Sequence, residues 1–102
     1  IWCNMKERDY LIILYDYYGD LLSVDNRRYF EDYYFDNLSL AEIAQNDNVS
    51  RNNVHKHLKS SEEKLLFYEE KLGLYKKDKK TKAKIDEIKD ENLRKLVYEV
   101  LK

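Results

Sequence analysis

Hydrophobic positions recur at three- and four-residue intervals through most of the chain, and this spacing predicts helices. The first such stretch covers about residues 6–22, from Lys6 to Leu22, and its apolar face is formed by Tyr10, Ile13, Leu14, Tyr17, Tyr18 and Leu21. Ser23 is a suitable N-cap for a second helix that ends near Phe35. Asp36 and Asn37 follow, and both residue types compete with helical hydrogen bonds through their side chains. Two helices are therefore expected before the middle of the chain.

The segment from residue 39 to residue 60 predicts a helix-turn-helix. Ser39 and Glu42 have the spacing of a capping box, in which each side chain accepts a hydrogen bond from the other residue's backbone N–H. The helix that starts at Leu40 is short, because Asp47 and Asn48 favour a turn. Ser50 is then the N-cap of the next helix. The turn needs a left-handed residue, usually glycine, and Asn48 is the residue type next best suited to it. The expected motif core consists of Ile43, Ala44, Val49, Val54 and Leu58.

Polar residues of the second motif helix are expected to face outward once Val54 and Leu58 face inward. Arginine can bind guanine, asparagine can bind adenine, and lysine can meet phosphate, while the first-turn amides offer a helix N-terminus to another phosphate. The residues expected to contact nucleic acid are Ser50, Arg51, Asn52, Asn53, His55, Lys56 and Lys59. The alternative is an ordinary solvated face, because helix-turn-helix units also serve in protein contacts.

Beyond the motif, the sequence predicts a helical arm. Apolar positions continue in three- and four-residue steps to Tyr75, which predicts a long helix. Gly73 either lies within this helix, at a cost of about 1 kcal/mol relative to alanine, or caps its end near Leu72. A last helix over residues 82–101 has the apolar positions Ile85, Ile88, Leu93, Leu96, Val97, Val100 and Leu101.

The expected fold class is therefore all-α, with a helix-turn-helix domain over residues 6–60 and an extended arm over residues 61–102. The arm consists of the end of the long helix and the C-terminal helix. Its apolar surface exceeds what one small neighbouring domain can cover, so we expect a homodimer; packing of the two helices within one chain is the alternative.

Charge changes this picture through its distribution. The net charge is only −1, which argues against strong sequence-independent binding to nucleic acid. Residues 1–40 contain four Lys and Arg against eight Asp and Glu, whereas residues 76–84 contain six lysines against Asp78. This lysine run is expected to be an extended, solvated connection, or a loop that contacts phosphate.

Other function classes find little support. Gly19 and Gly73 are isolated, so there is no glycine-rich phosphate loop, and no nucleophile–base pair stands out. His55 and His57 diverge around a helix and are too far apart in direction to hold one metal ion. Cys3 is alone, so an intrachain disulfide is excluded and a reducing compartment fits. We expect no catalysis, no cofactor and no metal.

The apolar runs are too short to cross a bilayer, and no signal segment opens the chain, so we expect a cytoplasmic protein. Residues 1–4 precede Met5, and we expect the natural chain to start at Met5.

Two resemblances follow from these residues. Leu38–Ala44 followed by Val49–Val54 looks like the C-terminal helix-turn-helix of bacterial sigma factors. About residues 8–75 resemble the YlxM family of small bacterial proteins, through Leu14–Tyr18, Leu21–Leu22, Tyr33–Tyr34, the helix-turn-helix and Glu62–Leu72. Members of that family are all-helical, are regarded as DNA-binding proteins and are encoded beside signal recognition particle genes. The resemblance implies a DNA-binding regulator linked to that pathway; the alternative is an interaction module that binds the particle's RNA or protein.

Overall fold

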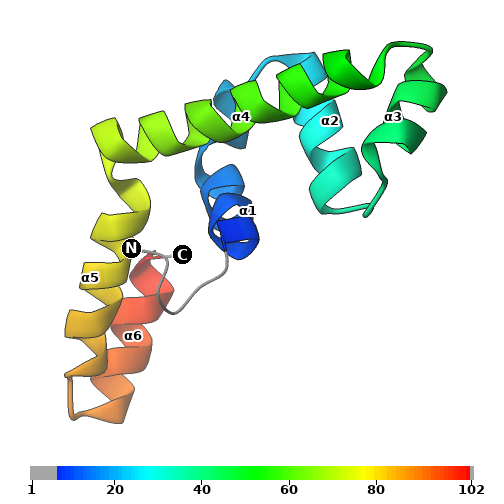
Figure 1. The fold of residues 1–102 in the computed structure, drawn as a ribbon. Helices are drawn as coiled ribbons and strands as arrows, with labels where there is room; N and C mark the ends of the chain where they lie inside the picture. Colours follow the sequence, from blue (N-terminus) through cyan, green and yellow to red (C-terminus); the bar gives the residue numbers. More distant parts are fainter. Residues whose placement is uncertain (1–6, 102) are drawn as a thin grey trace. The chain divides into compact units, whose positions relative to one another are not determined.

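The computed structural model describes residues 7–101, and all regular structure in this range is helical. The elements are α1 (Glu7–Tyr18), the 3-10 turn η1 (Gly19–Leu21), α2 (Val24–Tyr34), α3 (Leu40–Asp47), α4 (Arg51–Leu72), α5 (Leu74–Asp86) and α6 (Glu91–Leu101) (Figure 1). The expected all-α fold class is confirmed. Cys3 and Lys6 lie outside the described residues. None of the helices in this range is both long and apolar enough to span a membrane.

The chain divides into two compact units between Leu72 and Gly73. The first unit contains α1 to α4, and the second contains α5 and α6. The expected boundary after residue 60 falls inside α4, which continues without a break to Leu72. The reason lies in the second half of that helix, where Leu65 is fully buried and α4 packs against α1. The whole of α4 therefore belongs to the first unit.

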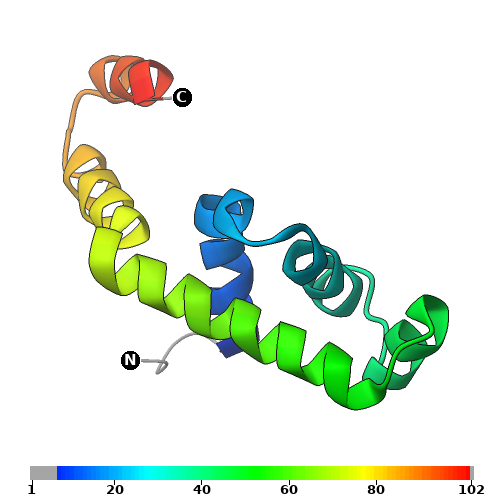
Figure 2. The same ribbon diagram turned by 90° about the horizontal axis from the view of Figure 1, so that it is seen from above.

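The core of the first unit lies between α4 and the three shorter helices, which gather along it (Figures 1 and 2). Phe30 lies at its centre, with ring centroids 4.5 Å from Tyr15 and 4.3 Å from Tyr34. The buried hydrophobic residues of this unit are Leu11, Leu14, Tyr18, Leu22, Tyr29, Phe30, Tyr34, Ile43, Ala44, Val54, Leu58 and Leu65. Each fully buried Leu or Phe contributes about 1.5–3 kcal/mol, so this core fixes the rotation of α4 about its own axis.

The end of the first apolar stripe differs from the expectation. Leu21, expected on the buried face, is 56% exposed, and Leu22 is buried in its place. The cause is η1, where the N–H of Leu22 bonds to the carbonyl of Gly19 at 3.1 Å. A 3-10 turn advances each residue further around the axis than an α-helix does, and this changes which leucine faces the core.

The second unit corrects two expectations. The lysine run is not a loop, because residues 76–84 lie within α5. The single last helix expected over residues 82–101 is two elements, with a break between Asp86 and Glu91. Asp90 caps α6, where its Oδ1 accepts hydrogen bonds from the N–H groups of Asn92 (3.0 Å) and Leu93 (3.2 Å). The two helices pack against each other, and the Tyr98 hydroxyl donates to Asp86.

Candidate nucleic-acid interface

The motif begins at a complete capping box. The Ser39 hydroxyl accepts a hydrogen bond from the N–H of Glu42 at 3.1 Å, and the Glu42 carboxylate accepts one from the N–H of Ser39 at 3.0 Å. Hydrogen bonding by the Ser39 backbone, and then by its side chain, lowers the pKa of Glu42 below its ordinary value. The predicted start of α3 is therefore confirmed.

The turn between α3 and α4 contains three residues, each with a defined task. Asn48 adopts the left-handed conformation with φ 56°, as its position in the motif predicts. The N–H of Val49 then bonds to the carbonyl of Ala44 at 3.0 Å, which ties the turn to the end of α3. The Ser50 hydroxyl accepts a hydrogen bond from the N–H of Asn53 at 3.0 Å and caps α4. The two helices are thus joined by a short, hydrogen-bonded turn.

Four of the five residues expected in the motif core are buried: Ile43, Ala44, Val54 and Leu58. Val49 departs from the expectation, because its side chain is 37% exposed. Its backbone is held against the end of α3, and this leaves the side chain at the edge of the small core. The buried side chains of Val54 and Leu58 determine which face of α4 remains exposed.

The exposed face of α4 collects most of the residues expected to contact nucleic acid. Ser50 in the turn is exposed, and so are Arg51, Asn52, His55, Lys56 and Lys59. Asn53 differs, because it is half-buried and turned toward α2. It lines a polar hollow of about 360 Å³ together with Ser23, Asn26, Lys56, His57, Ser60 and Lys64.

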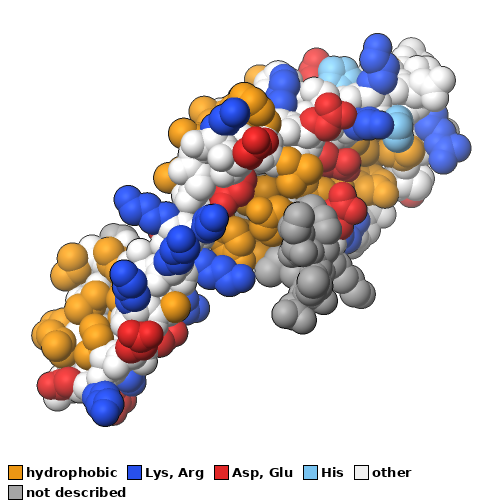
Figure 3. Space-filling view, turned by 60° about the vertical axis from the view of Figure 1, so that its left-hand side comes forward, with side chains coloured by type: hydrophobic (Ala, Val, Ile, Leu, Met, Phe, Trp, Pro, Cys, Tyr) orange, Lys and Arg blue, Asp and Glu red, His pale blue; other side chains and the backbone are white. Residues whose placement is uncertain are grey.

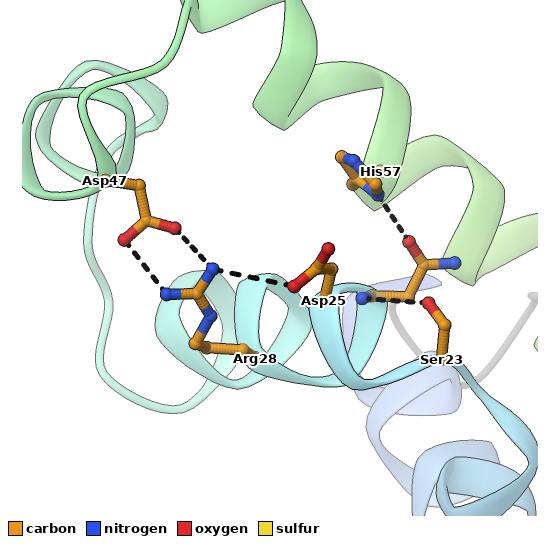
Figure 4. Close-up of polar contacts among 6 residues, drawn as sticks. Ser23, Asp25, Arg28, Asp47 and His57 are labelled. Atoms are coloured by element: carbon orange, nitrogen blue, oxygen red, sulfur yellow. Dashed lines mark hydrogen bonds and ion pairs between the residues drawn. The ribbon is translucent and has the colours of Figure 1, made fainter.

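A polar contact between α2 and α4 was not foreseen from the sequence. Asn26 is buried, and its Oδ1 lies 2.7 Å from Nδ1 of His57 (Figure 4). The His57 ring also packs 5.2 Å from the ring of Tyr29, and the Ser61 hydroxyl donates to the His57 carbonyl at 2.9 Å. His57 is therefore a structural residue, held between α2 and α4. Its partner is distant in sequence, and no local pattern marks the pair.

A second contact joins α2 to the end of α3. Nη2 of Arg28 lies 2.6 Å from Oδ2 of Asp47, and Nη1 donates to Oδ1 at 3.1 Å (Figure 4). Asp25 lies 3.7 Å from the same guanidinium. The pair fixes the position of α3 immediately before the turn, and Arg28 offsets the negative charge of Asp47.

The electrostatics of the exposed face are favourable to an anion. Residues 48–61 contain Arg51, Lys56 and Lys59 and no Asp or Glu. Figure 3 shows blue basic side chains and pale-blue histidines grouped at one end of the first unit. Acidic residues begin at Glu62, which accepts a hydrogen bond from the Tyr34 hydroxyl; burial and this bond raise the pKa of Tyr34. Among residues 7–101, no three His, Cys, Asp or Glu side chains gather where they could hold a metal ion.

Comparisons with known proteins agree with this architecture. The model of the UPF0122 family, described as "Putative helix-turn-helix protein, YlxM / p13 like", matches residues 5–102. The chain is 46% identical over 81 residues to the UPF0122 protein of Caldanaerobacter subterraneus subsp. tengcongensis, which covers 79% of this chain and 69% of the relative. It is 42% identical over 91 residues to that of Malacoplasma penetrans, covering 87% and 85%. The chain therefore belongs to the UPF0122 family of YlxM / p13-like helix-turn-helix proteins.

Proposed function

We propose that this chain is a DNA-binding regulatory protein whose contact with duplex DNA is the exposed face of α4 between Ser50 and Lys59. The observation that carries the proposal is an exposed basic face on a helix whose rotation is fixed by Val54 and Leu58. No Asp or Glu occurs between residues 48 and 61, and the first carboxylate, Glu62, borders the face beside His55 and Lys59. A helix held in this way can enter the major groove with its N-terminal residues on the base edges.

Each exposed residue has a role that its chemistry supports. Arg51 can form bidentate hydrogen bonds with guanine, and Asn52 can form bidentate hydrogen bonds with adenine. Lys56 and Lys59 are exposed on the same helix and can meet phosphates through their ammonium groups. Ser50 and the free amides of the first turn of α4 offer a further phosphate site at the positive end of the helix dipole. His55 lies between these groups on the same face.

The test is fluorescence anisotropy at low and physiological salt, with random duplex DNA, a selected genomic duplex and the RNA of the signal recognition particle. We expect sequence-selective binding to DNA. Arg51→Ala should reduce the preference for the selected duplex by about 1–3 kcal/mol. Arg27→Ala is the matched control, because it removes the same charge from an exposed ion pair on α2. It should leave the preference unchanged.

The other outcomes separate the alternatives. Binding to the particle's RNA alone, unaffected by Arg51→Ala, would contradict DNA recognition and favour the interaction module. Absence of binding to any nucleic acid would contradict DNA recognition and binding to the particle's RNA. It would leave an interaction module with a protein partner, in which the motif serves as a scaffold. The signal recognition particle pathway is the proposed setting because of the resemblance to the YlxM family.

We further infer that the chain acts as a homodimer through α6. The stripe formed by Leu93, Leu96 and Val100 is 50%, 59% and 81% exposed. Among residues 73–101, Ile85 is the one buried hydrophobic side chain. Folding units below about 40 residues usually need a disulfide, a metal or a partner chain to be stable. A second copy of the same stripe would supply the missing contacts, and dimeric helix-turn-helix proteins bind paired half-sites.

A further inference from the structure

The lysine run forms an ordered face of α5. Lys76, Lys80 and Lys84 are four residues apart and Lys77 is adjacent, so these four side chains lie on one side of the helix. They line a shallow hollow of about 580 Å³ together with Gly73, Thr81 and Ala83. We call this surface the lysine face. Lys79 and Lys82 point in other directions, and the Lys79 ammonium lies 5.9 Å from the ring centroid of Tyr75.

No carboxylate of α5 belongs to the lysine face. Asp78 lines a second hollow on the side of α6, together with Ile85 and Leu101; Lys77 lies at the border and lines both hollows. Asp86 accepts the hydrogen bond from Tyr98. In the described part of the chain, no ion pair is formed by Lys77, Lys80 or Lys84. Like charges four residues apart destabilise a helix, so this arrangement weakens α5 when it is alone.

The position of the lysines within α5 adds to this cost. The first turn contains no acidic residue, and Lys76 and Lys77 lie near the positive end of the helix dipole. Cations are unfavourable at that end and favourable at the other. A polyanion laid along the lysine face would relieve both the repulsion between lysines and the conflict with the dipole.

The two units differ in net charge, and the excess positive charge lies in the unit that contains α5. Residues 1–72 contain nine Lys and Arg against fourteen Asp and Glu, whereas residues 73–102 contain ten against six. The net charge of −1 therefore conceals an acidic first unit and a basic second unit. Figure 3 shows blue side chains along the second unit beside an orange apolar patch. The unit that contains the helix-turn-helix has too little positive charge to supply much sequence-independent affinity.

We propose that the lysine face of α5 binds the phosphodiester backbone of a nucleic acid and supplies the sequence-independent part of its affinity. This inference rests on the proposed function, because the partner is the nucleic acid that α4 recognises. The two surfaces have different roles in this proposal: α4 contacts base edges, and α5 neutralises phosphates. Lysine suits this role because its ammonium acts as a point charge and needs no planar partner.

The experiment compares two triple variants of the full chain. K77Q/K80Q/K84Q removes three charges from the lysine face, and K79Q/K82Q/K89Q removes three lysines from elsewhere in the second unit. Glutamine is a good helix former, so both variants should keep the circular dichroism of the wild type. Affinity for a random DNA duplex and for an RNA duplex of equal length is measured by anisotropy over a range of salt concentrations.

We expect the lysine-face triple to lower the slope of log affinity against log salt by about 2 to 3 on the DNA duplex, because each neutralised phosphate contributes about 0.9. The control triple should change the slope by less than about 1. A clear drop on RNA is also expected, because the contact is with the backbone. Equal changes in the two triples would overturn the proposal, and so would a drop confined to one nucleic acid.

The outcome is distinguishable from that of the proposed function. Binding without sequence preference, but with a slope that depends on the lysine face, would support the role of α5 and contradict base recognition by α4. Sequence-selective binding with the same slope in both triples would support α4 and contradict α5. A wild type that binds neither duplex at any salt concentration would overturn both.

Discussion

The Arg28–Asp47 pair is a side-chain contact that holds the end of α3 against α2. The Asp47 side chain is only 16% exposed, and its two oxygens are both engaged by the guanidinium of Arg28. Burial of the Tyr29 hydroxyl, together with its hydrogen bond to Asp47, raises the pKa of Tyr29. Removing Arg28 would leave a largely buried carboxylate without its cation at the start of the turn.

We therefore expect Arg28→Met to lower the free energy of unfolding by about 1–2 kcal/mol, because a charged hydrogen-bond partner of a mostly buried group is lost. Arg27→Met, on the same helix, should cost less than about 0.5 kcal/mol, because its pair with Asp20 is exposed on both sides. Urea unfolding followed by circular dichroism measures both. If both variants lowered the free energy of unfolding by the same amount, the contact with Asp47 would contribute no more to stability than an exposed ion pair.

The capping box gives the motif a dependence on pH. The hydrogen bonds of Ser39 lower the pKa of Glu42 in the folded state. The ionised Glu42 carboxylate therefore stabilises the fold fully above the pKa that it has in the unfolded chain. This stabilisation is lost as the pH falls through the lower, folded pKa. The free energy of unfolding of the wild type should exceed that of Glu42→Gln by a constant amount near neutral pH, and this difference should shrink below about pH 4. Denaturation curves at several pH values test this; a difference that grows on acidification would contradict the assignment.

Single residues were predictable from the sequence where their partners are close along the chain. Ser23, Ser39 and Asn48 act within four residues of themselves, so the sequence alone indicates their roles. The pair of Asn26 and His57 bridges 31 positions, and its existence depends on how α2 and α4 pack. For the same reason, the outward face of α4 was predictable, but the inward turn of Asn53 was not.

Among the elements, the four α-helices before residue 73 were predicted from the sequence, whereas the 3-10 turn η1 and the division of the second unit into two helices were not. The apolar positions Ile85, Ile88 and Leu93 predict one helix through residues 82–101. The step of five between Ile88 and Leu93 breaks the helical period, and Asp90 is an N-cap residue type followed by Glu91. These two local signals mark the start of α6, although the apolar positions alone indicate one continuous helix.

Gly73 ends α4 in a left-handed conformation with φ 61°, which resolves the two possibilities left open by the sequence. The conformation of Gly73 predicts which of two variants at this position is the more stable. Gly73→Asn should be more stable than Gly73→Ala by up to about 1 kcal/mol, because Asn tolerates positive φ better. A continuous helix through this position would give the opposite order, because Ala has the higher helix propensity. Thermal unfolding by circular dichroism decides between them.

At the scale of the whole molecule, the division at Leu72 and Gly73 separates two kinds of surface. The first unit has an extensive buried core and the exposed basic face of α4, whereas the second has few buried side chains, the lysine face and an apolar stripe. The composition of the chain averages these features, which is why its net charge alone suggested weak binding to nucleic acid. The sequence indicates the separation of charge along the chain, and the helical structure of residues 76–84 adds that four of the lysines share one side of α5.

The apolar stripe of α6 leads to the prediction about assembly. Sedimentation equilibrium at tens of micromolar should give twice the monomer mass of 12.5 kDa for the wild type. L96Q/V100Q should be monomeric at the same concentration, because it replaces the two most exposed apolar side chains of the stripe. K95Q/E99Q, on the polar side of α6 and without a change in net charge, should remain dimeric. A monomeric wild type would contradict the homodimer.

The dimer also leads to a prediction about DNA binding. L96Q/V100Q should lose the preference for paired half-sites over single half-sites, because a monomer has only one α4. It should keep the Arg51-dependent discrimination between sequences, because each α4 reads its own half-site.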